Sequence, residues 1–169
     1  MNWSNIYPCL DDKTSSTYFE GHYTYHPAWA ARVVKKIAPK VHVDISSTLH
    51  FCSSIRSLSC MHTVEHIGLG RYGNPIDPVA DLKAMQELKR VVAQGGNLII
   101  VVPVGRPKMA FNAHRIYSYQ QICSYFGPFT LKEFSLVPDN YLETGMIINA
   151  SQIDVDQQDW GCGCFWFVK

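Results

Sequence analysis

The residues best suited to chemistry gather in one short stretch, MHTVEHIGLGRYG, at positions 61–73. His62, Glu65 and His66 fall within five positions there, and Arg71 follows them. Imidazole and carboxylate groups move protons near neutral pH and also bind metal ions. The stretch is therefore compatible with a metal site, with the mouth of a ligand pocket, or with the end of a buried strand that runs into a turn.

The metal alternative comes from the spacing of His62, Glu65 and His66, which matches the pattern H-x-x-E-H of inverted zinc proteases. In that chemistry a helix presents both histidines, the glutamate activates a water, and a third ligand, such as His114, comes from elsewhere. Here the stretch runs directly into glycines instead of continuing as a long helix. We keep a metal-dependent hydrolase as an alternative function, but we expect no metal site.

The pocket alternative rests on where these residues would lie in an α/β sheet, because ligands bind beyond the carboxyl ends of its strands. A second polar cluster follows the next apolar strand, at Arg106, Lys108, Asn112, His114 and Arg115. We expect the acid–base groups to be Glu65, His66 and His114. We expect the substrate to be positioned by Arg71, Tyr72, Asn112 and Arg115, since arginine can bind a carboxylate or phosphate in bidentate fashion. The structural alternative is a set of packed histidines with Asn112 in a turn.

The elements that must position these residues follow from periodicity and from helix-ending signals. We expect helices from His26-Pro27 to Pro39, from Asp77 as N-cap to Gly95-Gly96, and over Tyr119–Phe126 with Ser118 as cap. We expect strands over Val41–Ile45, Asn97–Val102, Phe129–Val137 and Cys162–Val168. The stretch Ile55–Val64 fits a strand or a helix. Alternating strands and helices favour an α/β sheet with right-handed crossovers.

Composition bounds the function classes. A chain of 169 residues, 47% hydrophobic and 17% charged, suits one globular domain, which we place at 26–169 with an N-terminal arm or cap at 1–25. The net charge of +1 argues against binding to nucleic acid or to an anionic membrane. No apolar run reaches the ~18 residues of a membrane span. We expect a cytoplasmic protein whose six cysteines, including Cys162 and Cys164, are mostly buried thiols.

The run SLSCMHTVEHIGLGRYGNPIDPVADLKAMQELKRVVAQGGNLIIVVPVG resembles the later half of class I S-adenosylmethionine-dependent methyltransferases. More closely, the segments HVDIS, CMHTVEHIGLGRYG, PVGRPK, FNAHRIYS and GCGCFWF resemble a methyltransferase-like family known as a domain of unknown function. The resemblance covers most of residues 18–169.

This resemblance implies a Rossmann-like sheet, mostly parallel, with an antiparallel C-terminal strand. VHVDIS would be the first strand, and the fourth would end at His62 to Glu65. S-adenosylmethionine would be the cofactor, bordered by Asp44, Ser46, Met61 and His62. His66 or His114 would act as the base towards an acceptor that could be a small molecule, a glycan or a protein side chain.

The sequence departs from the methyltransferase pattern between the first and fourth strands. Only about ten residues separate Ile45 from Ile55, whereas one βαβ unit takes ~30 residues or more. Either the chain lacks strands 2 and 3 of the fold, or the sequence omits a segment there. Without them, the first strand would be an exposed sheet edge suited to pairing in a homodimer. The alternative function is then a catalytically inactive binding or dimerisation module.

Overall fold

The computed structural model describes residues 21–45, 55–71, 73 and 75–169. Its centre is a six-stranded sheet with the order β1-β2-β3-β8-β6-β7. The strands are β1 (Val43–Ile45), β2 (Ile55–Met61), β3 (Val92–Val104), β6 (Thr130–Val137), β7 (Ile147–Ile148) and β8 (Gly161–Val168). A separate hairpin is formed by β4 (Lys108–Met109) and β5 (Arg115–Ile116).

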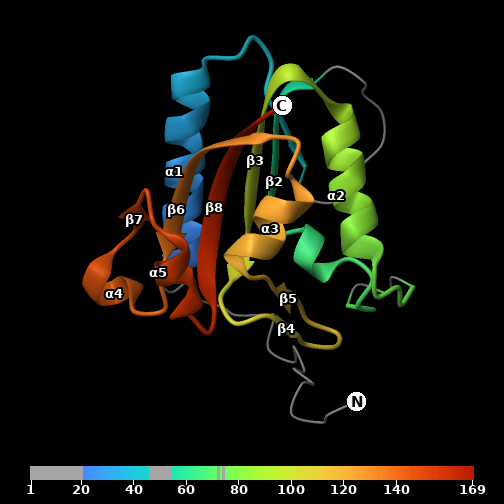
Figure 1. Cartoon of the computed structure of the whole chain (residues 1–169), viewed down its shortest axis with the longest axis vertical. Helices are drawn as coiled ribbons and strands as arrows, with labels where there is room; N and C mark the ends of the chain where they lie inside the picture. The colour runs from blue at the N-terminus through green and yellow to red at the C-terminus, as the bar shows by residue number, and fades with distance from the viewer. Residues whose placement is uncertain (1–20, 46–54, 72, 74) are drawn as a thin grey trace, which may run out of the picture.

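The helices are α1 (Gly21–Ile37), the 3₁₀ turn η2 (Val64–His66), α2 (Ala80–Val91), α3 (Tyr119–Tyr125), α4 (Tyr141–Thr144) and α5 (Gln152–Asp156). Figure 1 shows α1 on one face of the sheet and α2 with α3 on the other. The α/β class is confirmed. None of the helices in the described residues has both the length and the apolar character needed to cross a membrane.

The strand directions correct one expectation. β1, β2 and β3 are parallel neighbours, but β8 pairs antiparallel with both β3 and β6, and β7 pairs antiparallel with β6. The antiparallel C-terminal strand is confirmed. The sheet is mixed, however, and the expected mostly parallel pairing is wrong, because the last strand inserts between β3 and β6.

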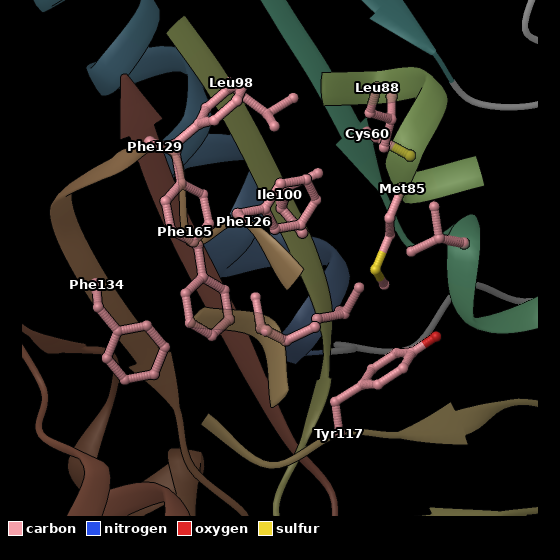
Figure 2. Close-up of a cluster of buried hydrophobic side chains, with 14 of the residues drawn as sticks. Cys60, Met85, Leu88, Leu98, Ile100, Tyr117, Phe126, Phe129, Phe134 and Phe165 are labelled. Carbon is pink, nitrogen blue, oxygen red and sulfur yellow. The ribbon is translucent and has the colours of Figure 1, made fainter. Parts of the chain in front are cut away.

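The core lies on both faces of the second half of β3, which explains why residues 98–104 of that strand are all apolar. Leu98 and Ile100 point towards α2 and α3, where aromatic rings from β6, from β8 and from the segment between α3 and β6 surround them (Figure 2). Ile99 and Val101 point to the opposite face and pack under α1. Each such side chain contributes about 1.5–3 kcal/mol when it leaves water, so the two layers hold the central strands rigidly.

The contacts of α1 with the sheet include a buried polar group. Trp29 Nε1 donates to Glu133 Oε1 on β6 at 2.7 Å, and Arg32 forms an ion pair with the same oxygen at 2.5 Å. A buried carboxylate is costly unless it is paired and hydrogen-bonded. These contacts therefore fix how α1 lies across the antiparallel half of the sheet.

Several local predictions can be checked directly. The ambiguous stretch after residue 55 is strand β2 up to Met61, and Ser118 caps α3 through a capping box with Gln121. Asp77 is not the N-cap of α2, because that helix starts two residues later than predicted, with Val79 as N-cap. Gly95-Gly96 does not end the helix either, since both glycines lie inside β3.

The other differences concern the start of α1 and the segment between β6 and β8. The described part of α1 begins at Gly21, so Pro27 lies inside the helix rather than at its first turn. Residues 138–160, for which the sequence analysis expects no helix or strand, contain the short elements α4, β7 and α5. These elements have at most five residues each, too few for a periodic signal.

Candidate functional site

The chain turns sharply at His62, directly after β2, and this turn places the candidate residues beyond the carboxyl ends of the parallel strands. The backbone N–H of His62 donates to the carbonyl of Val101 at 2.9 Å, as a last ladder bond. His62 itself has a φ of 48°, in the left-handed region that non-glycine residues rarely adopt. The chain then enters η2, which carries Glu65 and His66.

Gly68 lets this loop fold back onto the start of α2. Its φ is +78°, and a Cβ at this position would lie 2.1 Å from the carbonyl oxygen of Asp77. The carbonyl of Gly68 accepts from the N–H of Asp77 at 2.9 Å. Only glycine permits so close an approach together with a positive φ, and the approach holds η2 in place.

Glu65 is the centre of the site. Its side chain is 0% exposed and lies between two histidines: Oε1 is 3.0 Å from His62 Nδ1 and 3.6 Å from His66 Nε2. Its second oxygen, Oε2, is buried and has no hydrogen-bond partner among the described residues. A buried carboxylate needs positive charge or donors around it, so the two imidazoles and this carboxylate form one electrostatic unit.

His62 links Glu65 to the first residues of β8. Its Nε2 lies 3.5 Å from Cys162 Sγ. Burial alone would lower the pKa of His62, but the hydrogen bonds to Cys162 and Glu65 outweigh burial and raise the pKa to about 10. Burial and the neighbouring Cys164 raise the pKa of Cys162, so its thiol is neutral. The Glu65 carboxylate is therefore the anion that stabilises the charged imidazole of His62.

His66 is held by the backbone of the next loop. Its Nδ1 donates to the carbonyl of Ala113 at 2.6 Å, which assigns a proton to Nδ1 and leaves Nε2 towards Glu65. Arg71 Nη1 lies 3.3 Å from His66 Nδ1. The tautomer and the ring plane of His66 are therefore set before any ligand arrives.

His114 reaches the same place from the loop after β3, as the sequence predicts. Its ring centroid is 6.4 Å from that of His66 and 4.9 Å from the stacked ring of Trp160. Burial, and then the charge of His66, lower the pKa of His114 to about 4. His114 is thus neutral at pH 7, so it can form hydrogen bonds with a ligand but carries no positive charge.

Two further histidines come from α1, and the sequence reading missed them. The ring of His22 stacks on that of His62 at 6.0 Å, and the ring of His26 meets His62 edge-on at 4.9 Å. Burial, followed by the charge of His62, lowers the pKa of His26 to about 4. Their spacing of four residues, on one face of a helix, was the available signal.

The remaining predicted residues lie in different environments. Arg115 is 4% exposed. It donates to the carbonyls of Ile67 at 2.6 Å and Pro78 at 3.2 Å, and its Nε is 3.4 Å from Asp81 Oδ2. These contacts favour a structural role, in which Arg115 joins the loop after β2 to α2. Asn112 is exposed with a φ of 57°, as in a turn.

Two of the residues predicted to border the cofactor lie on strands, Asp44 on β1 and Met61 on β2. Asp44 accepts a hydrogen bond from Ser59, and Met61 packs against the cluster beneath α1. Ser46 and Tyr72 were also predicted as site residues, and both lie outside the described residues.

The histidines of the H-x-x-E-H pattern do not share a helix face, because His62 precedes η2 and His66 ends it. Both converge on Glu65 rather than on a common point. In the part of the chain that the structure describes, the side chains grouped closely enough for a metal ion are instead His22, His62 and Cys162.

The carboxyl end of the parallel strands thus collects five of the seven histidines, namely His22, His26, His62, His66 and His114. Glu65 and Cys162 lie among them. In Figure 1 this is the lower end of the sheet, where the first turns of α1, the hairpin β4–β5 and the start of β8 come together.

Comparison with known proteins adds the family. Residues 33–144 match the model of a family described as "Caenorhabditis protein of unknown function, DUF268". The match includes Glu65, His66 and His114, whereas His22 and Cys162 lie outside it. No curated protein matches the chain. Because the matched residues make up more than half of the sequence, the chain belongs to the DUF268 family.

Proposed function

We propose that the chain is a Rossmann-like, S-adenosylmethionine-dependent methyltransferase-like domain, and that its acceptor binds at the cluster formed by Glu65, His66 and His114. The acceptor is a small molecule or a glycan with a hydroxyl or amine to be methylated. The observation that carries this proposal is the placement of a buried carboxylate beside an oriented imidazole, with Glu65 Oε1 3.6 Å from His66 Nε2, where parallel strands end.

The strand order supports the methyltransferase-like part of the proposal. In doubly wound sheets the order 3-2-1-4-5-6 makes strands 1, 4 and 5 parallel neighbours. β1, β2 and β3 are parallel neighbours in the same sense, and β1 and β2 match the first and fourth strands implied by the resemblance. Ligands of such sheets bind beyond the carboxyl ends, which is where His62 to His66 lie.

The chemistry assigned to each residue follows from its contacts. A proton taken from the acceptor by His66 Nε2 would be stabilised by the carboxylate of Glu65, so Glu65 is the positioning residue of the base. The neutral ring of His114 would form a hydrogen bond with the methyl acceptor, as donor or as acceptor of that bond. Arg71 would attract an anionic acceptor. The remaining catalytic contribution would come from alignment of donor and acceptor and from exclusion of water.

The binding site for the methyl donor is less complete than the acceptor cluster, and this supports an alternative function. In the described residues β1 pairs only with β2, so its other side is a sheet edge. The stretch 46–54 is too short for a βαβ unit of ~30 residues. The part of the fold that binds the rest of S-adenosylmethionine would have to come from a second copy of the chain, joined through β1. If it does not, the chain is a binding or dimerisation module without catalysis.

Isothermal titration of the full chain with S-adenosylmethionine, and with its demethylated product, distinguishes the two functions. A methyltransferase should bind both with one site per chain, and the His66→Ala variant should bind them with a Kd within about twofold of wild type, because we place His66 on the acceptor side. In the same variant, transfer of a labelled methyl group to cell metabolites or glycans should be lost. Absence of binding to either compound would contradict the methyltransferase and favour the binding module.

A further inference from the structure

A second chemical centre lies next to the acceptor cluster, on the α1 side of the sheet. It is formed by His22 from α1, His62 from the end of β2 and Cys162 from the start of β8. One ligand atom from each residue lies within 4.8 Å of the other two. No step of the proposed methyl transfer uses these three side chains together, so their convergence needs its own explanation.

The separation of two of the atoms is already that of metal ligands. Cys162 Sγ lies 3.5 Å from His62 Nε2. In a tetrahedral zinc site with Zn–S near 2.3 Å and Zn–N near 2.0–2.1 Å, sulfur and nitrogen are about 3.6 Å apart. A metal ion could therefore bind these two residues without moving the strands that carry them. His22, on a partly exposed helix turn, needs only a side-chain adjustment.

The orientation of His62 is an independent observation that points to a metal. Its Nδ1 lies 3.0 Å from Glu65 Oε1, so Nδ1 holds a proton and Nε2 is turned towards Cys162 and His22. Histidines that bind metals usually donate their other N–H to a carboxylate in this way, which fixes the tautomer and increases ligand basicity. The left-handed φ of His62 is part of what aims the ring.

Charge balance supports the same conclusion. Glu65 is fully buried, and its Oε2 has no hydrogen-bond partner among the described residues. Cys162 is also fully buried, at the opposite nitrogen of the His62 ring. A divalent cation at Nε2 of His62 would deprotonate the thiol. The charges of the cation, the Cys162 thiolate and the Glu65 carboxylate would then sum to zero within the buried cluster.

We propose that His22, His62 and Cys162 bind one zinc ion, with Glu65 orienting His62 behind it. The donor set of two imidazoles and one thiolate suits zinc and disfavours magnesium or calcium, which take oxygen ligands. Three protein ligands leave one coordination position for water or for a ligand, as in catalytic zinc sites. The site lies beside the acceptor cluster, because His22 and His114 both contact the ring of Trp160.

The direct test is metal binding by the full chain, purified without a histidine tag, stripped with a chelator and titrated with zinc or cobalt. We expect one equivalent of zinc, in competition with a chromophoric chelator. We expect the cobalt form to show a thiolate-to-cobalt charge-transfer band in the near ultraviolet. A chain that binds no zinc, or a cobalt form without the thiolate band, would overturn the proposal.

Variants separate the metal site from ordinary core packing. Cys162→Ala should abolish the thiolate band and weaken zinc binding at least tenfold, and His22→Ala should weaken zinc binding to a similar degree. Cys164→Ala is the matched control, since Cys164 is equally buried on the same face of β8, and it should leave affinity within about twofold. Glu65→Gln should cost about 10–100-fold in affinity, the usual effect of losing an outer carboxylate. Equal losses in Cys162→Ala and Cys164→Ala would contradict the assignment, and His22→Ala provides the test should both β8 variants fail to fold.

Discussion

His62 and Cys162 are 100 residues apart in the sequence, yet His62 Nε2 lies 3.5 Å from Cys162 Sγ. β2 and β8 are not neighbours in the sheet, since β3 lies between them. The contact forms because His62 follows the last residue of β2 and turns across the end of β3. The first prediction rests on this contact and on the buried carboxylate of Glu65 beside it.

The first prediction concerns the charge of His62 in the metal-free chain. Replacing Glu65 with Gln keeps a hydrogen-bond acceptor but removes the negative charge, so the pKa of His62 should fall from about 10 towards its ordinary value of 6.5. NMR titration of the imidazole measures this change directly. An unchanged pKa would mean that Glu65 is not the anion that holds the proton on His62.

The same pair has a consequence for stability. A histidine whose pKa is higher in the folded than in the unfolded chain adds stability below the unfolded pKa, and this stability is lost as pH rises through the folded pKa. The free energy of unfolding of the metal-free wild type should therefore decline between pH 6.5 and about 10. In Glu65→Gln the decline should be smaller, as measured by urea unfolding across that range.

The second prediction concerns Glu133, beneath α1, and has the opposite sign. Burial opposes ionisation, but the hydrogen bonds from Arg32 and Trp29 outweigh it and lower the pKa of Glu133 below 4.5. The stability from this carboxylate is complete above the unfolded pKa and is lost as pH falls through the folded one. Glu133→Gln should therefore be destabilised at pH 7 and should lose less stability than wild type on acidification. Thermal melts at pH 7 and pH 3 provide the comparison.

A matched variant isolates one contact of Glu133. Trp29→Phe removes the indole N–H, keeps an aromatic ring in the core, and should cost about 1–3 kcal/mol because it removes a hydrogen bond to a charged group. An unchanged free energy of unfolding would show that Trp29 contributes to packing alone.

The third prediction separates a structural from a substrate-binding role for Arg115. Because its guanidinium is buried against Asp81 and two backbone carbonyls, Arg115→Met should destabilise the fold by about 3–5 kcal/mol, the usual cost of leaving a buried charge unpaired. Arg71→Met, at a partly exposed position, should change stability by under about 1 kcal/mol. Denaturant unfolding gives both values. Equal, small effects would return Arg115 to the substrate-binding residues.

The fourth prediction concerns the free side of β1. If two copies pair there, light scattering after size-exclusion chromatography should give twice the mass of the chain. Val43→Pro removes a backbone donor from β1 and should shift the mass to that of one chain. Circular dichroism of the variant should remain that of wild type, because β1 is a three-residue edge strand. A wild-type chain that is monomeric at high concentration would rule out the pairing.

Features with a local cause could be predicted from the sequence. Asn97–Val102 is apolar on both faces and forms the centre of β3, and Ser118 with Gln121 caps α3. The prediction that His66 and His114 meet followed from the rule that parallel strands end at one edge of the sheet, and their rings lie 6.4 Å apart. The starting point of α2 was wrong because proline and aspartate signals suit a preceding turn as well as a helix cap.

The amino-acid sequence by itself determined most of the longer strands, the existence of α1, α2 and α3, and a polar cluster after β2 and β3, because these depend on neighbours within a few residues. Only the tertiary structure decided which side chains share a site. It brought His22 and Cys162 to His62, and it turned Arg115 inward to Asp81. The physical reason is that β8 inserts between β3 and β6 and that α1 packs across them, and these long-range arrangements leave no periodic mark in the sequence.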